Sequence, residues 1–122
     1  MWIQKDENKT KNKIEGNVGE VLSVNFLKKK GYKILETNFK TKFGEIDIIA
    51  KDQNIIVFVE VKRRETLKYG RPIEAIDYRK EAKIKMVAEY YLNKTKNYDA
   101  DVRFDVIEIV GEEISHIENA FM

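Results

Sequence analysis

Apolar residues recur every three or four positions early in the chain, and this spacing predicts an amphipathic helix. The residues in this repeat are Ile14, Val18, Val21, Leu22 and Phe26. Gly31 follows the lysines at 28–30, and we expect it to end the helix, because glycine suits the position after a helix and cations suit its negative end. Residues 1–11 are polar and aperiodic, and we expect a disordered tail there.

Three β-branched, alternating or continuously apolar segments follow and predict strands. They cover residues 32–38, 43–50 and 54–64. The last two are separated by turn-forming residues, so we expect them to form a hairpin. A turn centred on Asp52 and Gln53 pairs Lys51 with Asn54 and places Asp47 opposite Phe58.

The second half of the chain predicts one more helix and one or two strands. The helix runs from Asp77, a suitable N-cap, to Lys94. Strands are expected over residues 102–110 and 113–118, with Gly111 between them. The residues of the helix that are expected to face inward are Ile84, Val87, Ala88, Tyr91 and Leu92. The order α-β-β-β-α-β(-β) predicts a single α/β domain over residues 12–122, with a mixed central sheet flanked by helices.

Composition narrows the classes of function. The 122 residues include no cysteine, which excludes disulfide scaffolds, thiolate zinc sites and cysteine nucleophiles, and the single histidine, His116, excludes His-rich metal sites. No apolar stretch approaches the roughly 20 residues that span a bilayer, and no signal peptide is recognisable. We therefore expect a cytoplasmic protein with no membrane partner. A net charge of +2 argues against a uniformly basic nucleic-acid binder.

Charged residues lie inside the apolar strands, and they are the candidate chemistry. Asp47 sits between Ile46 and Ile48, while Glu60 and Lys62 alternate with valines. In the expected register Asp47 and Glu60 are diagonal neighbours on one face, about 7–8 Å apart at the backbone.

Carboxylates on one half-buried face repel each other unless a positive charge lies between them. Mg²⁺ prefers such oxygen ligands, and with a nearby lysine it can hydrolyse a phosphodiester. The alternative is a solvated sheet face on which Asp47 and Glu60 form ion pairs with Lys62 and Arg64. The unbroken apolar run beside Glu60 argues against that alternative. Glu45 is either a further acid of the site or a partner for Lys62.

An Asp followed by a strand with Glu-x-Lys resembles the PD-(D/E)XK nuclease signature, with Ile46 at the position of the proline. The residues that carry a wider resemblance are Gly19–Glu20, Gly31–Tyr32–Lys33–Ile34–Leu35, Asn38, Gly44 to Ala50, Val57 to Lys62, Gly70, Pro72, Glu74–Ala75, Lys80, Ala88, Tyr91–Leu92, Arg103 to Val106, His116–Ile117 and Asn119–Ala120–Phe121. From about residue 12 to the end, the chain resembles the YraN-like family of small bacterial proteins. The resemblance implies a restriction-endonuclease-like fold, similar to that of archaeal Holliday junction resolvases.

The same resemblance implies roles for individual residues. Asp47 and Glu60 match the acids that bind Mg²⁺ or Mn²⁺, and the backbone carbonyl of Val61 would be a further ligand. Lys62 matches the motif lysine, and Glu20 matches an acid that resolvase-like members supply from the first helix. Glu20 also fits a capping box with Asn17.

The implied activity is a Mg²⁺-dependent endonuclease acting on DNA rather than RNA, with branched DNA among its substrates and a homodimer as its assembly. The alternatives are a non-catalytic nucleic-acid-binding module of the same fold, or a structural or partner-binding cytoplasmic protein.

The near-neutral total charge hides a basic segment. Residues 62–85 hold nine Lys or Arg against four acids, whereas residues 86–122 hold three against eight. This segment begins at Lys62 and suits contact with a phosphate backbone. The candidate nucleic-acid contacts are Arg64, Lys68, Arg71 and Lys80. For Lys80 the favoured alternative is a solvated helix face, and for His116 it is a structural role.

Overall fold

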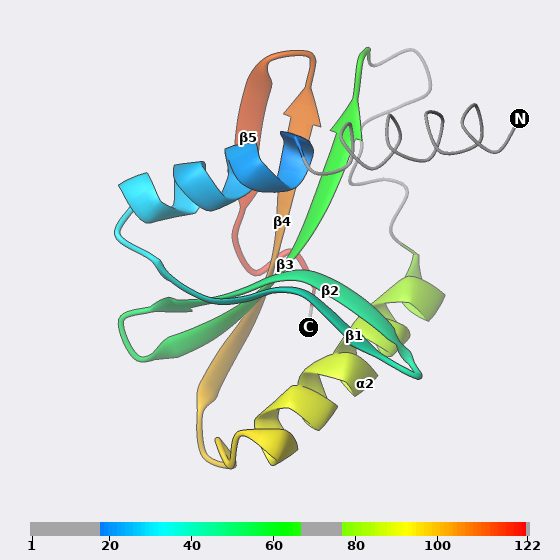
Figure 1. Ribbon diagram of the computed structural model, residues 1–122. Coiled ribbons are helices and arrows are strands. Elements are labelled where there is room, and N and C mark those ends of the chain that lie inside the picture. The colour runs from blue at the N-terminus through cyan, green and yellow to red at the C-terminus, as the bar shows by residue number, and fades with distance from the viewer. Residues whose placement is uncertain (1–17, 67–76, 122) are drawn as a thin grey trace, which may run out of the picture.

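The computed structural model describes residues 18–66 and 77–121 (Figure 1). A helix over residues 18–29 is followed by strands β1 (Lys33–Thr41), β2 (Gly44–Asp52) and β3 (Ile55–Arg64). Helix α2 (Tyr78–Lys94) and strands β4 (Asp101–Val110) and β5 (Glu113–Ile117) complete the domain. The predicted α/β class and element order are confirmed. The expected tail at residues 1–11 lies outside the described residues.

The five strands form one mixed sheet in the order β1-β2-β3-β4-β5 (Figure 1). Three neighbouring pairs are antiparallel, and β3 and β4 are parallel. A parallel pair needs a crossover connection, and α2 lies within it. Among the described residues, no helix is both long enough and apolar enough to cross a membrane.

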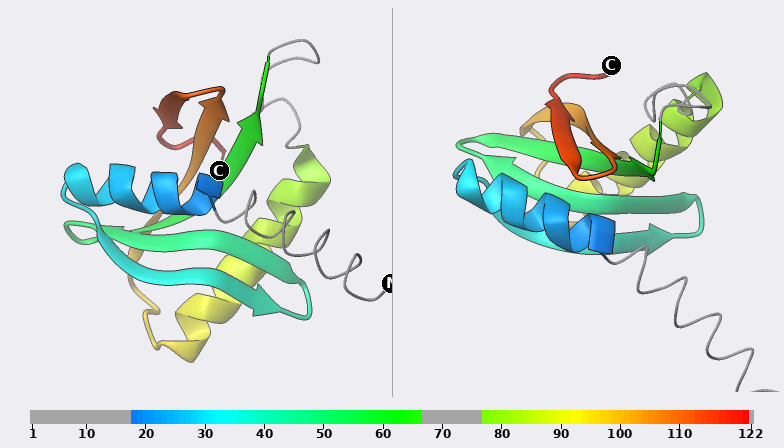
Figure 2. Two further views of the ribbon diagram at one scale, coloured as in Figure 1. Left: turned by 45° about the horizontal axis from the view of Figure 1, so that its top comes forward. Right: turned by 90° about the horizontal axis from the view of Figure 1, so that it is seen from above.

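The two helices cover opposite faces of the sheet (Figure 2). On one face, α2 buries Ile84, Val87, Ala88 and Tyr91 against a cluster that includes Phe58. On the other face, Leu27 of the first helix packs against a cluster that includes Ile107. Both faces of the central strands are thus buried, which explains why β3 reads as a nearly continuous apolar run.

The first helix packs through a different face from the one its apolar repeat indicates. Val18, Val21 and Leu22 are exposed, whereas Ser23 and Leu27 are buried. The buried side includes Gly19, where an added Cβ would meet the side chains of β3 residues at 3.7 and 3.8 Å. Small residues let the helix approach the sheet closely, and a count of apolar positions cannot detect that kind of contact.

The predicted hairpin register is wrong by two residues. Asp52 pairs with Ile55 and Ile49 with Phe58, so the turn is centred on Gln53 and Asn54. Gln53 adopts a positive φ of 55°. This conformation is uncommon for residues other than glycine, so the sequence of the turn does not predict it. A shift of two residues keeps the side chains of the paired residues on their predicted faces. Extended by one residue beyond its last pair, Ile48 with Val59, this register would set Asp47 opposite Glu60 instead of diagonal to it.

Candidate metal centre

The site forms where β2 and β3 stop pairing. The last paired residues are Ile48 and Val59, and beyond them the backbone N–H of Val61 donates to Asp47 Oδ2 at 2.8 Å. The carboxylate thus takes the place of the strand partner for Val61. This bond fixes the Asp47 side chain beside β3.

The alternation of side chains along β2 also changes at this point. Ile46 and Ile49 both pack in the cluster under α2, whereas Ile48 and Ala50 pack in the cluster under the first helix. Asp47 lines a pocket on the α2 side of the sheet together with Glu60. The predicted placement of these two acids on one face is confirmed.

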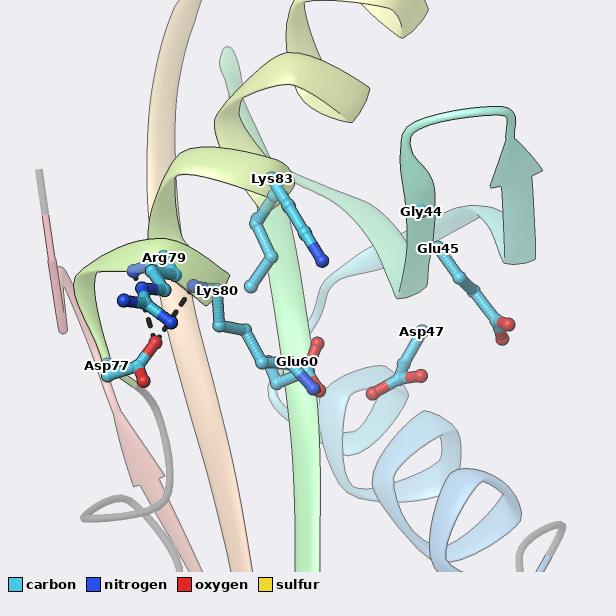
Figure 3. A pocket seen from close by; sticks show the side chains of 9 residues that line it. Gly44, Glu45, Asp47, Glu60, Asp77, Arg79, Lys80 and Lys83 are labelled. Carbon is cyan, nitrogen blue, oxygen red and sulfur yellow. Dashed lines mark hydrogen bonds and ion pairs between the residues drawn. The ribbon is translucent and has the colours of Figure 1, made fainter.

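This pocket has a volume of about 450 Å³ and lies between β2, β3 and the first turns of α2 (Figure 3). Figure 3 shows the carboxylates of Asp47 and Glu60 on facing sides, with Lys80 lying beside Glu60. The lining residues are Gly44, Glu45, Asp47, Glu60, Asp77, Arg79, Lys80, Lys83 and Ile84. Three of the acids, Glu45, Asp47 and Glu60, come from the strands, Asp77 caps α2, and the three cations come from α2.

Three carboxylates are close enough to share one cation. Carboxylate oxygens of Glu20, Glu45 and Asp47 all lie within 4.8 Å of one another. Glu20 comes from the helix on the opposite face of the sheet, and it meets Asp47 beyond the last β2–β3 pair. Asn38 Nδ2 donates to Glu20 Oε2 at 2.7 Å and orients it toward the cluster.

Glu60 is neutralised by lysines in this arrangement. Its Oε1 lies 3.0 Å from Lys80 Nζ and 3.6 Å from Lys62 Nζ, and its side chain is only 8% exposed. A buried carboxylate needs such partners, because an unpaired charge away from water is costly. The predicted Glu60–Lys62 proximity is confirmed, and Lys80 proves to be a closer partner.

The electrostatics of the pocket reflect crowding of like charges. Burial and the neighbouring carboxylate of Glu60 raise the pKa of Asp47 to about 7, despite the hydrogen bond from Val61. Burial and the adjacent ammonium of Lys80 lower the pKa of Lys62. Two groups of opposite type are thus both shifted toward neutrality, a pattern typical of functional sites.

The remaining predicted residues have different positions. Among the described residues, Glu45 forms its ion pair with Lys40 at 4.0 Å and not with Lys62, and it joins the acidic cluster. Arg64 ends β3 and is partly exposed. Lys68 and Arg71 lie outside the described residues, as does Asn17 of the alternative capping box. The carbonyl of Val61 as a metal ligand stays a prediction.

Sequence reasoning assigned no role in the site to Asn38, Arg79 or Lys83. Asn38 lies in β1 between the residues paired with Ile46 and Ile48, next to Asp47, with a positive φ of 52°. Asparagine tolerates this conformation better than most residues, so an asparagine within the strand could have indicated the unusual backbone at this position. Arg79 and Lys83 belong to the basic segment, and nothing in the sequence distinguishes them from its other cations.

A second polar cluster lies within β4 and β5 and is structural. Asp105 is fully buried and accepts hydrogen bonds from Arg103, His116 and the backbone of Asn119. Lys30 donates to His116 Nδ1 at 2.8 Å, so the ring proton lies on Nε2 and points to Asp105. Burial would raise the pKa of Asp105, but its hydrogen bonds with His116 and Arg103 lower it. The predicted structural role of His116 is confirmed.

Comparisons with known proteins agree with the resemblance drawn from the sequence. The chain is 55% identical over 106 residues to a UPF0102 protein of Thermodesulfovibrio yellowstonii, covering 87% of this chain and 94% of that protein. It is 49% identical over 112 residues to one from Clostridioides difficile, covering 90% and 98%. The names of these relatives state a family and no activity. Residues 19–109 match the family described as "Uncharacterised protein family UPF0102", and the chain belongs to this family.

Proposed function

We propose that this protein is a metal-dependent nuclease that hydrolyses DNA phosphodiesters, with branched structures among its substrates. The observation that carries the proposal is the convergence of Asp47, Glu60 and Lys80 on one pocket, with Lys62 lying 3.6 Å from Glu60. Glu20 and Glu45 add two more carboxylates beside Asp47. Such a set of charges serves no evident packing purpose, and its repulsion is what a bound cation would relieve.

The donors in the pocket fit Mg²⁺ or Mn²⁺. Every candidate side-chain ligand offers a carboxylate oxygen, which is the donor that these hard cations prefer. Asp47 would hold the ion with Glu60 and the Val61 carbonyl, and Glu20 and Glu45 stand close enough to contribute. When bound, the ion supplies Lewis acidity toward a phosphoryl oxygen and the attacking water.

The protein's own residues account for the rest of the chemistry. Lys62 stands beside Glu60, where it can orient the attacking water or neutralise an oxygen of the scissile phosphate. Its lowered pKa eases release of a proton from its ammonium group. Lys80, Lys83 and Arg79 supply positive charge on the α2 side of the pocket, where a phosphate backbone would lie.

The experiment that tests this function is cleavage of single-stranded, duplex, flap and four-way-junction DNA with EDTA, Mg²⁺ or Mn²⁺. We expect metal-dependent cleavage by the wild type and a loss of at least about 100-fold in Asp47→Asn and Glu60→Gln, the usual scale for a lost charge-stabilising group. A matched control is Asp101→Asn, which changes an exposed acid on β4. DNA binding without cleavage by any form would support the non-catalytic module. The absence of both DNA binding and cleavage would support a partner-binding protein.

The homodimer and the cytoplasmic compartment belong to the same proposal. Two symmetric cuts in a branched substrate need two sites, which a twofold-symmetric dimer would supply. Small-angle scattering of the protein with and without a four-way junction measures the particle mass. Monomers under both conditions would rule out the dimer and leave the nuclease proposal intact.

A further inference from the structure

Glu60 is paired with Lys80 and does not belong to the cluster of carboxylates beside it. The cluster whose oxygens lie within 4.8 Å of one another consists of Glu20, Glu45 and Asp47. Glu60 lines the same pocket, yet its Oε1 makes a 3.0 Å ion pair with Lys80. Lys80 therefore supplies the positive charge that a cation would otherwise bring to Glu60.

The two partners differ in their freedom to move. The Glu60 side chain is 8% exposed and held within the central strand β3. The Lys80 side chain is 39% exposed and extends from the first turn of α2 on a flexible stem. If the pair separates, Lys80 is the side chain that leaves. Glu60 then retains Lys62 at 3.6 Å, so it is not left without a partner.

We propose that Lys80 is a positioning residue that competes with the divalent cation for Glu60, and that a DNA phosphate draws Lys80 away and completes the cation site. This inference rests on the proposed function. Metal ion and DNA would then bind cooperatively, because each favours the arrangement in which Lys80 has left Glu60. The protein alone would bind the cation weakly, and the complete site would form at a phosphodiester.

Calorimetric titration of Mn²⁺ into the DNA-free protein tests the competition. Lys80→Met removes the ammonium and keeps the stem, and Lys83→Met removes one charge from the same pocket one turn further along α2. General loss of positive charge affects both variants, so their difference reports the Glu60 pairing. We expect Lys80→Met to bind Mn²⁺ about threefold to tenfold more tightly than Lys83→Met, the scale of one partly exposed ion pair.

Coupling to DNA is tested by titrating Ca²⁺, which takes the same oxygen ligands, with and without a four-way junction. We expect the junction to tighten Ca²⁺ binding to the wild type, and to tighten it several-fold less in Lys80→Met.

Two results would overturn the inference while leaving the proposed function standing. One is Mn²⁺ affinity in Lys80→Met equal to or below that of Lys83→Met, with unchanged thermal unfolding. The other is equal tightening of Ca²⁺ binding by DNA in wild type and Lys80→Met. If the wild type and Asp47→Asn bind Mn²⁺ equally, or if neither Lys80→Met nor the junction-bound wild type binds a divalent cation, the metal site itself is wrong and both proposals fail.

Discussion

At the scale of single residues, Asp47 carries an unfavourable charge in the cation-free protein. Its pKa of about 7 in the folded protein lies above the value of about 4 in an unfolded chain. Between these pH values the folded state holds a proton that the unfolded state has released. The free energy of unfolding should therefore fall as the pH rises from about 4 to about 7.

Asp47→Asn should abolish this fall, because asparagine carries no charge at any of these pH values. In EDTA, the melting temperature of Asp47→Asn relative to wild type should be higher at pH 8 than at pH 5, as measured by thermal unfolding. Asp101→Asn controls for removal of an exposed acid. Parallel pH curves for wild type and Asp47→Asn would show that the carboxylate is not destabilised by its surroundings.

Asp105 is buried like Asp47, but its partners act in the opposite direction. Asp105→Asn leaves the Arg103 guanidinium, bound at 2.9 Å by both carboxylate oxygens, without its main counter-charge. We expect a loss of about 3 kcal/mol in the free energy of unfolding, measured with urea, as when one partner of a buried ion pair is removed. A loss below about 1 kcal/mol would mean that the other partners of Arg103, which are Asp52, Tyr32 and Glu118, suffice.

The lowered pKa of Asp105 adds a pH signature to its stabilising role. The contribution of a carboxylate with a lowered pKa is complete above its unfolded value of about 4 and is lost as the pH falls through the folded value. Asp105 thus stabilises the fold at neutral pH, where ionised Asp47 destabilises it.

At the scale of elements, α2 delivers Lys80 to the site, and its N-terminus is held by one side chain. Asp77 accepts hydrogen bonds from the backbone N–H groups of Arg79 and Lys80, both at 3.1 Å. Asp77→Ala should cost about 1 kcal/mol of unfolding free energy, measured with urea, as is usual for loss of an N-cap. Asp77→Ser keeps a capping oxygen and should recover most of that loss. Equal losses in both variants would point to the charge instead of the cap.

The elements were predictable to different degrees for physical reasons. Helix α2 combined a capping residue with a regular apolar face, so Asp77 and Tyr91 were placed correctly. The first helix was misread because its contact face uses Gly19 and Ser23, which no hydrophobic pattern reveals. Register depended on the backbone conformation of Gln53, whereas the period of two preserved the faces of the strands.

The site shows the same division. Asp47 and Glu60 were predictable because charged residues inside apolar strands are conspicuous, and a strand fixes which face each occupies. The pairing of Lys80 with Glu60 depends on how α2 crosses the sheet, and sequence alone does not define that geometry. The position of Glu45 beside Glu20 likewise requires the ending of the β2–β3 pairing at Ile48.

At the scale of the whole molecule, positive charge is unevenly distributed along the chain. The described part of the basic segment brings Lys80 and Lys83 to the pocket, whereas Lys96 lies just beyond the other end of α2. If DNA lies over the pocket, only the cations near it displace counterions from the phosphates. Log affinity falls linearly with log salt concentration, and each such contact adds about 0.9 to the magnitude of this negative slope.

Lys83→Gln should therefore lower the magnitude of that slope by about one, and Lys96→Gln should leave it unchanged. Both residues are exposed lysines removed in the same way, so the two variants have equal total charge and differ only in position. Fluorescence anisotropy of a labelled four-way junction at several salt concentrations in EDTA gives the slopes without cleavage. An equal reduction of the slope in both variants would mean that DNA responds to the overall charge of the protein. The pocket would then not be the DNA-binding surface.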